Sequence, residues 1–482
     1  MLSLLTLTLV VGSVIGQLRD RPDYSDLPGR YCERRGTVRG DCCPQRLDDC
    51  SRPIRDTLCY CDEFCDRGAS GDCCPDYFTF CLGEIPSEPL RLSCQFRTDK
   101  ILPGNTVQNN CNTCKCEQVS ENETRLMCET QQCLVQEDLI QDINYNSAYG
   151  WTASNYSQFW GRKLNTGLKY LLGTNYPNDL ITQMYPVTKI YDPRELPRSF
   201  DARDKREWSG LIGPVQDQGW CGASWAFSTA STAADRVAIQ SPERRRVHLS
   251  EQNIIDCGYL RRDGCEGGNL DRAWNYLRRY GVAEAECYPY ESGSTQTKGT
   301  CRTPRRSRSP HELTCTNGTR VSLGRRDMIG MQPPYRIASE EQDIMHELYH
   351  SGPVQAIMQV HEDFFAYRTG VYRVTGLRSS SRTAYHSVRI LGWGEETGDR
   401  GQQVKYWIVA NSWGRQWGED GLFRIVRGKN EADIESFVVG SWAKPRRGGR
   451  RRSRGYASYR RSRRHHSRSE RARAKRHHTV KE

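Results

Sequence analysis

Apolar residues follow two different spacings in the C-terminal half of the chain. From Ala223 to Ile239 they recur at helical intervals with few helix-breaking residues, which predicts a helix. Val354–Val360 and Tyr406–Ala410 are short runs rich in strand-forming residues, which predicts two strands. Residues 195–442 are therefore expected to form one domain of mixed helices and strands.

The two ends of the chain depart from this pattern. Residues 1–16 are apolar and end in small residues, as signal peptides do, although a charged first segment is missing. An uncleaved anchor is the less favoured alternative, because a span needs ~20 apolar residues. No later stretch is apolar enough to cross a membrane. Residues 443–482 are rich in Arg, Ser and His, which predicts a disordered tail.

Cysteine is the most informative residue type in the composition. The 482 residues include 22 cysteines, in blocks of ten (Cys32–Cys81), six (Cys94–Cys133) and six (Cys221–Cys315). Even counts allow each block to close its own bridges, and so many cysteines are expected as disulfides in an oxidising compartment. Three glycosylation sequons fit export, at Asn122, Asn155 and Asn317. The sequence thus predicts a secreted, extracellular protein.

The net charge of +12 is concentrated in the tail. Residues 444–482 carry 17 Lys or Arg and two Glu, a charge of +15, which leaves −3 for the rest of the chain. Clustered Arg favours polyanions such as heparan sulfate, because binding releases their counterions. A solvated tail without a dedicated partner is the alternative, and a secreted protein rarely meets nucleic acid. Arg244–Arg246 and Arg305–Arg308 either extend a basic face or are processing sites.

The first cysteine block has closely spaced motifs. They are Cys59-Tyr-Cys61-Asp-Glu-Phe-Cys65, then Cys73-Cys74-Pro-Asp-Tyr, then Cys81. Residues 30–84 therefore resemble a somatomedin B-like domain, with ten cysteines where that family has eight. The pairing of the extra two is left open among Cys32, Cys42, Cys43 and Cys50. A metal site is the less favoured use of such pairs in a small secreted module.

Two further resemblances lie before the C-terminal domain. Residues 90–134, with Cys111-Asn-Thr-Cys114-Lys-Cys116, are similar to a von Willebrand factor type C module. Such a short unit buries little core, so it serves either binding or spacing. The cysteine-free residues 135–194 resemble the inhibitory propeptide of cathepsin B, and a helical linker is the alternative.

Residues 195–442 resemble the papain family, in its cathepsin B branch. The stretch Gln218-Gly-Trp-Cys221-Gly-Ala-Ser224-Trp-Ala-Phe is similar to the active-site helix of these proteases, in which a cysteine precedes Trp-Ala-Phe. Here Ser224 takes that place. Tyr-His386-Ser-Val and Ala-Asn411-Ser-Trp match the histidine and asparagine elements. The resemblance implies an α+β papain-like fold with a helical half and a β-barrel half.

By this resemblance Ser224 stands at the nucleophile position and His386 at the base. Asn411 would orient the base, and Gln218 would donate on the oxyanion side. Papain chemistry needs a thiolate, which a helix N-terminus and an imidazolium stabilise before the substrate arrives. A serine hydroxyl is too weak an acid to ionise in that way, so we expect an inactive protease. Residual hydrolysis by Ser224 and peptide capture without cleavage are the alternatives.

The resemblance implies three disulfides, Cys221–Cys265, Cys257–Cys301 and Cys287–Cys315. The occluding loop of cathepsin B, expected at 288–315, has only His311 where that protease has paired histidines. Carboxydipeptidase activity is therefore not implied. The stretch His346-Glu-Leu-Tyr-His350 fits the zinc-protease pattern H-E-x-x-H, but no third ligand follows at a known spacing. We expect neither a metal nor a cofactor.

The order of these units up to about residue 442 resembles the tubulointerstitial nephritis antigen family. That resemblance implies a secreted glycoprotein of the basement membrane or extracellular matrix. Laminin, type IV collagen and integrins are its implied partners, together with secreted signalling proteins. Nucleic acid and a membrane span are not implied, and the basic tail is not part of the resemblance.

Overall fold

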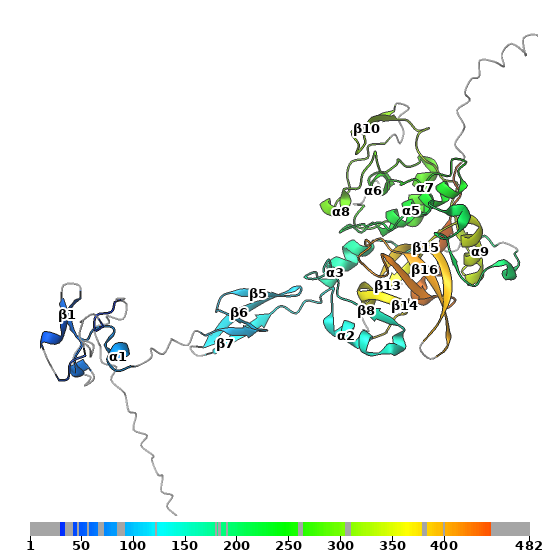
Figure 1. The fold of residues 1–482 in the computed structure, drawn as a ribbon. Helices are drawn as coiled ribbons and strands as arrows, with labels where there is room; N and C mark the ends of the chain where they lie inside the picture. Colours follow the sequence, from blue (N-terminus) through cyan, green and yellow to red (C-terminus); the bar gives the residue numbers. More distant parts are fainter. Residues whose placement is uncertain are drawn as a thin grey trace, which may run out of the picture. The chain divides into compact units, whose positions relative to one another are not determined.

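A computed structural model describes the chain between residues 29 and 444, drawn in Figure 1. Within that range it leaves out residues 34–41, 46–47, 55–56, 66–71, 84–91, 121–122, 179–180, 182–184, 189–190, 259–263, 304–309, 378–382 and 399–400. The expected signal peptide, the tail from residue 445, the sequon at Asn122 and the run Arg305–Arg308 lie outside the described residues. The chain forms two compact units, residues 1–105 with 116–126 and residues 106–115 with 127–482.

Disulfides hold the N-terminal part of the first unit together. Its elements are η1 (Asp48–Cys50), β1 (Ser51–Ile54), β2 (Thr57–Tyr60), η2 (Glu63–Cys65), α1 (Tyr77–Phe80), β3 (Cys94–Phe96) and β4 (Asp99–Ile101). The bridges of the first cysteine block are Cys32–Cys61, Cys42–Cys81, Cys43–Cys50, Cys59–Cys74 and Cys65–Cys73. Their sulfurs make most of a small core around Ile54 and Tyr77. Among the described residues, the group with metal-like spacing is Cys32, Cys61 and Cys74, and each of these is bridged.

The type C-like region is a small sheet of order β5-β6-β7, framed by further bridges. Strand β5 (Thr106–Asn109) pairs antiparallel with β6 (Asn112–Ser120), and β7 is Glu123–Cys128. The bridges are Cys94–Cys116, Cys111–Cys133 and Cys114–Cys128. Within the second unit, the Asn110 side chain donates to the Val135 carbonyl at 2.8 Å and accepts from the Gly161 amide at 3.0 Å. The turn after β5 is thereby fixed to the propeptide-like segment.

The second unit is built on a large sheet. Nine strands of the described chain form it, in the order β12-β18-β13-β15-β16-β17-β14-β8, with β9 paired to β15. They are β8 (Trp151–Ala153), β9 (Phe200–Asp201), β12 (Tyr335–Ile337), β13 (Val354–Val360), β14 (Tyr367–Tyr372), β15 (Ala384–Thr397), β16 (Gln403–Ala410), β17 (Leu422–Val426) and β18 (Val438–Gly440). The two predicted strands are confirmed as β13 and β16.

Helices form the other half of this unit, on one side of the sheet in Figure 1. They are α5 (Ser224–Gln240), α6 (Glu251–Gly258), α7 (Leu270–Arg279) and α8 (Ser292–Thr295), and α9 (Glu341–Ser351) packs on β15. The remaining elements are α2 (Glu137–Tyr145), η3 (Ser147–Tyr149), α3 (Leu164–Gly167), the π-turn η4 (Leu168–Leu172), η5 (Pro193–Glu195), η6 (Arg206–Trp208), β10 (His311–Thr314), β11 (Arg320–Leu323), η7 (Glu362–Ala366) and η8 (Glu431–Asp433). None of the described helices combines the length and apolar character that a membrane crossing requires.

Helix α5 is the predicted helix and lies at the centre of the fold. Fourteen of its 17 residues are buried, although many are polar. Ser228, Thr229 and Ser231 each donate their hydroxyl to the carbonyl four residues earlier, at 2.6–2.7 Å. These bonds satisfy hydroxyls that burial would otherwise leave unpaired. Small side chains, several of them hydrogen-bonded within the helix, thus allow both halves to pack against one helix.

The H-E-x-x-H motif lies on α9, where its glutamate serves packing. Glu347 pairs with Arg236 of α5 at 2.9 Å, and both side chains are almost fully buried. The Tyr335 hydroxyl also donates to Glu347. His346 stacks on Tyr191 with ring centroids 4.5 Å apart. The motif's carboxylate is therefore committed to a buried ion pair.

We expect Glu347→Ala to lower the free energy of unfolding by about 3–5 kcal/mol, because it leaves the Arg236 charge buried and unpaired. His350→Ala, at the exposed end of the same helix, is the matched control and should change stability by less than about 0.5 kcal/mol. Guanidinium unfolding with the disulfides intact measures both. Equal losses in the two variants would contradict the assignment.

Candidate functional site

Ser224 is the first residue of α5 and is fully buried. The bridge Cys221–Cys265 lies just before it, and the Gly222 amide donates to the Cys265 carbonyl at 3.0 Å. The next residue, Trp225, donates its indole N–H to the Gly264 carbonyl at 3.3 Å. The local sequence thus fixes the helix N-terminus, and Ser224 with it, to the loop at residues 264–268.

His386 and Asn411 come from neighbouring strands of the sheet, since His386 lies on β15 and Asn411 directly follows β16. Nε2 of His386 lies 2.7 Å from Oδ1 of Asn411. The Trp413 ring lies 5.1 Å from the imidazole, centroid to centroid. Nδ1 of His386 and Nδ2 of Asn411 are buried and have no hydrogen-bond partner among the described residues. The structure therefore forms the predicted His–Asn pair but leaves the other imidazole nitrogen unpaired.

Burial sets the protonation state of this histidine. Desolvation lowers the pKa of His386 from 6.5 to about 4, against the smaller opposing effect of its bond to Asn411. The ring is therefore neutral at ordinary pH. A thiolate–imidazolium pair needs the opposite state.

Gln218 is held from several sides. Its Nε2 donates to the Cys221 carbonyl at 2.8 Å and to the Tyr170 carbonyl at 3.3 Å. Its Oε1 accepts from the Ser412 hydroxyl at 2.6 Å. The Tyr290 hydroxyl donates to its main-chain carbonyl at 2.7 Å. The donor predicted for the oxyanion side is present, and it already binds a carbonyl of the propeptide-like segment.

That segment lies in the cleft between the two halves. The Thr174 amide donates to the Tyr385 carbonyl at 3.2 Å, and the Asn175 amide donates to the Gly268 carbonyl at 2.9 Å. The Gly268 amide returns a bond to the Gly173 carbonyl at 3.0 Å. The segment therefore binds main chain on both walls of the cleft, as an extended peptide would.

The hydroxyl of Ser224 is paired with this segment. Its Oγ lies 2.8 Å from Oγ1 of Thr174, and the Ser387 amide donates to it at 3.4 Å. Among the described residues it has no hydrogen bond to His386. Sequence reasoning missed Thr174, and its only signal was its place directly after Gly173 in the propeptide-like stretch.

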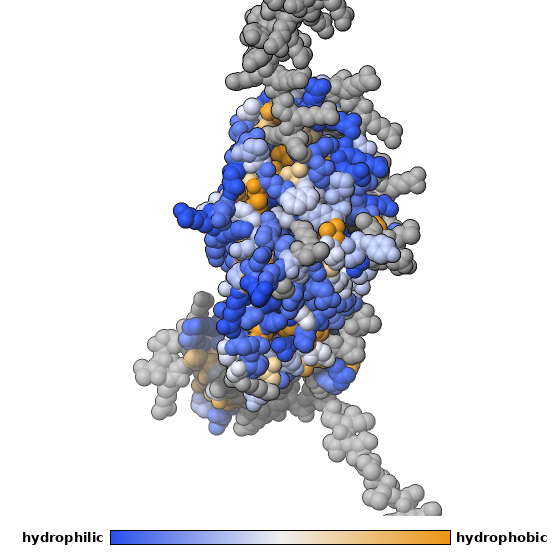
Figure 2. Space-filling view, turned by 90° about the vertical axis from the view of Figure 1, so that its right-hand side faces the viewer, coloured by the Kyte–Doolittle hydropathy of each residue, from blue (hydrophilic) through white to orange (hydrophobic). Residues whose placement is uncertain are grey.

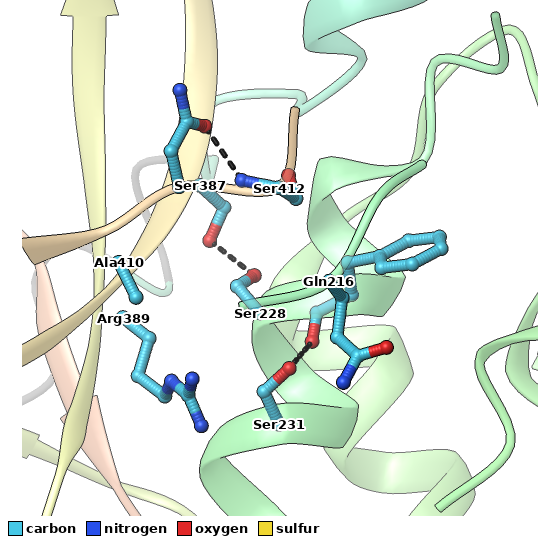
Figure 3. A pocket seen from close by; sticks show the side chains of 9 residues that line it. Gln216, Ser228, Ser231, Ser387, Arg389, Ala410 and Ser412 are labelled. Carbon is cyan, nitrogen blue, oxygen red and sulfur yellow. Dashed lines mark hydrogen bonds between the residues drawn. The ribbon is translucent and has the colours of Figure 1, made fainter. Parts of the chain in front are cut away.

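A small cavity of about 10 Å³ lies between α5 and β15, shown in Figure 3. Ser228 of the helix and Ser387 of the strand join across it with a hydrogen bond of 2.8 Å. Gln355 donates to both hydroxyls, at 2.6 and 3.1 Å. The volume is that of about one water molecule. These hydrogen bonds connect the helical half to the sheet.

The other predicted residues are placed as follows. The structure forms Cys221–Cys265, Cys257–Cys301 and Cys287–Cys315, the same pairs that the resemblance implies. Asn155 and Asn317 are exposed, which leaves glycosylation at both a prediction. Arg245 pairs with Glu284 at 2.8 Å, and Arg246 lines a separate cavity of about 570 Å³ beside His248. Arg244 and Arg246 are exposed and have no ion pair among the described residues, so both readings of this run stay predictions.

The fold and this Ser–His–Asn arrangement define a papain-like protein with serine at the nucleophile position. The pattern of the papain family of cysteine proteases matches residues 196–442. Procathepsin B S9 from Trypanosoma congolense superposes with a TM-score of 0.54 at 28% identity, over 65% of this chain and 99% of that one. A cathepsin B-like cysteine proteinase of Schistosoma japonicum is 32% identical, over 63% of this chain and 89% of the relative.

Other relatives match almost the whole chain. Human tubulointerstitial nephritis antigen-like is 42% identical, over 87% of this chain and 89% of its own length. Bovine tubulointerstitial nephritis antigen is 44% identical, over 86% of this chain and 87% of its own. The chain belongs to the tubulointerstitial nephritis antigen family, whose C-terminal domain is of the papain family.

We expect Gly173→Ala to release the segment from the cleft. Gly173 has φ +87°, and a β-carbon there would lie 2.0 Å from the Gly222 carbonyl oxygen. Limited proteolysis should then cut residues 168–195 about tenfold faster, since the docked state loses at least roughly 1–2 kcal/mol. Gly150→Ala is the control, because Gly150 has φ +74° with nothing within 4 Å. Similar cleavage of both variants would mean that backbone strain at a positive φ is enough to release the segment. The contact between Gly173 and Gly222 would then not be what holds the segment in the cleft.

The buried neutral histidine predicts a pH dependence of stability. In the unfolded chain the His386 ring takes up a proton below its ordinary pKa of 6.5, whereas the folded ring does so only near its pKa of about 4. The unfolded state therefore binds more protons in that window, so stability falls as pH drops through it. Between pH 7 and pH 5 we expect wild type to lose about 2 kcal/mol more unfolding free energy than His386→Gln. Parallel curves for the two proteins would refute the assignment.

Proposed function

We propose that this protein is a secreted, non-catalytic glycoprotein of the extracellular matrix that acts by binding matrix or secreted signalling proteins. Its cathepsin B-like domain is inactive in this proposal. The observation that carries it is the hydroxyl of Ser224, which occupies the nucleophile position and pairs with Thr174. The class of partner rests on the family.

The chemistry of Ser224 supports the inactive state. A serine nucleophile needs a histidine that accepts its proton during attack, which requires direct hydrogen-bond contact. The described structure gives Ser224 no such bond to His386, and Nδ1 of that ring is unpaired. Nor does a hydroxyl ionise in advance as a thiol does. Both routes to a nucleophile are therefore disfavoured.

Retention of His386, Asn411 and Gln218 has a structural explanation. Each is buried and bonded to another part of the site, so deletion of one would leave its partner unpaired in the core. Such an orphaned group costs about 1–3 kcal/mol. The site is preserved as packing under this proposal.

Capture of foreign peptides in the cleft is disfavoured for the intact chain. A peptide would have to displace residues 171–175, whose main chain is bonded to Gly268, Tyr385 and the Trp413 indole. The same displacement would leave the hydroxyl of Ser224 without Thr174. Partner binding through other surfaces is therefore favoured.

The matrix role is supported by composition, surface and relatives. Eleven disulfides join the 22 cysteines in the described chain, as expected of an extracellular protein. One face, shown in Figure 2, is mainly hydrophilic with scattered hydrophobic side chains, which suits polar recognition. The implied partners are laminin, type IV collagen, integrins and secreted signalling proteins.

A fluorogenic peptide assay tests the inactive state with the full-length protein. We expect wild type and Ser224→Ala to be indistinguishable from the blank. Each is also assayed with Gly173→Ala, which opens the cleft. Ser224→Cys combined with Gly173→Ala is the positive control for an intact frame, and it should gain turnover where the serine forms show none.

Turnover by wild type that Ser224→Ala abolishes would overturn the inactive state. The matrix role is measured separately, as binding to immobilised laminin and type IV collagen. Wild type and Ser224→Ala should bind with the same Kd. Absence of binding to both would contradict the matrix role.

A further inference from the structure

Five cationic side chains gather where helix α7 ends. Arg278 and Arg279 form the last turn of that helix, Arg325 and Arg326 follow β11, and Lys444 is the last described residue. Each of the five is exposed. They come from three separate parts of the chain, so local sequence did not reveal the cluster.

Contacts between the three segments place them on one surface. Nη2 of Arg325 donates to the Arg279 carbonyl at 2.9 Å. The Lys444 amide donates to the Gly330 carbonyl at 3.0 Å. A β-carbon on Gly330 would lie 3.3 Å from Cδ of Lys444 and 3.7 Å from the Leu277 carbonyl, one residue before Arg278. We call these five residues the α7 basic face.

Within the described part of the chain, none of the five forms an ion pair. Less exposed cations of the domain are neutralised, as Arg389 is by Asp235 at 2.7 Å and Arg424 by Glu419 at 2.8 Å. Asp327 is the acidic residue next to Arg326, and its Oδ2 accepts the Gly324 amide at 2.8 Å. The α7 basic face therefore carries a positive charge that its own fold does not balance.

Helix electrostatics explains only part of this cluster. Cations in the last turn of a helix interact favourably with its dipole, which accounts for Arg278 and Arg279. Arg325, Arg326 and Lys444 lie outside the helix, and the effect fades within one turn. The helix dipole therefore does not account for these three cations.

The sequence beyond Lys444 is cationic as well. Residues 445–482 contain 16 Lys or Arg and two Glu, so a run of net charge +14 begins at the edge of this face. A ligand that carries many negative charges matches the sequence of the tail as well as the face. Fixed guanidinium groups on a folded surface hold planar or tetrahedral oxyanions in defined geometry, with two donors each.

We propose that the α7 basic face is a binding site for a linear sulfated polysaccharide of the heparan sulfate type. The ligand class rests on the extracellular location proposed above. Affinity arises from displaced counterions, and each cation that contacts a sulfate adds roughly one unit to the slope of log Kd against log salt. The site is distinct from the cleft at Ser224 and from the cavity beside His248.

Full-length protein binding to a heparin dodecasaccharide at several NaCl concentrations tests the site. The test variant is Arg278→Gln/Arg279→Gln/Arg326→Gln, which keeps the bond from Arg325 to the Arg279 carbonyl. The control is Arg368→Gln/Arg373→Gln/Lys429→Gln, which removes equal charge from exposed cations of the sheet half that have no ion pair with described residues. Equal unfolding midpoints establish that both variants are folded.

We expect the test variant to bind about tenfold more weakly at physiological salt and its slope to fall by roughly two to three units. The control should change Kd less than about threefold. Equal binding by both variants would mean that the tail alone accounts for affinity, and the proposal would be wrong. Equal loss of binding to single-stranded DNA of matched charge would overturn the sulfate class. Peptide turnover by Ser224 would contradict the proposed function but leave the comparison of heparin binding unchanged.

Discussion

The buried polar contacts between helix α5 and strand β15 are the constraint on which the rest of the structure depends. Ser228 and Ser387 share a hydrogen bond, and Gln355 binds both. Further along the same interface, Arg389 pairs with Asp235 in the core. Buried polar groups are expensive to leave unpaired, so this interface allows one relative placement of the helical half and the sheet. The positions of Ser224 and His386 follow from it.

Within that frame one atom separates this domain from its protease relatives. A serine hydroxyl at residue 224 gives up its proton far less readily than a cysteine thiol. It also forms hydrogen bonds readily with a neighbouring hydroxyl. Thr174 supplies that hydroxyl, and the pair is buried in the cleft. The same scaffold that would orient a substrate thus orients part of its own chain. Glycine at 173 is needed because the segment passes close to the main chain of Gly222.

Burial also decides which charged side chains need a partner. In the sheet half, Arg424 and Arg427 lie where strands pack, and acidic partners neutralise them. At the end of α7 the cations point to solvent, so burial demands no partner, and none of the described acids pairs with them. A charge left unbalanced at no cost to folding is available to a ligand. The basic surface can therefore serve a ligand without any change to the polar contacts of the interior.

Several features could be predicted from the amino-acid sequence alone. Helix α5 and strand β13 follow from local spacing, since small residues allow burial on every side and β-branched residues favour a strand. The position of Ser224 and the three bridges of the domain are implied by the resemblance to the papain family. Other features depend on residues that only the fold brings together. Arg236 meets Glu347 across 111 positions, and Cys32 and Cys42 pair forward into the later cysteine motif. The contact of Thr174 with Ser224 and the grouping of Arg279, Arg325 and Lys444 have no local signature, because hydrogen bonds and charge act through space and not along the chain.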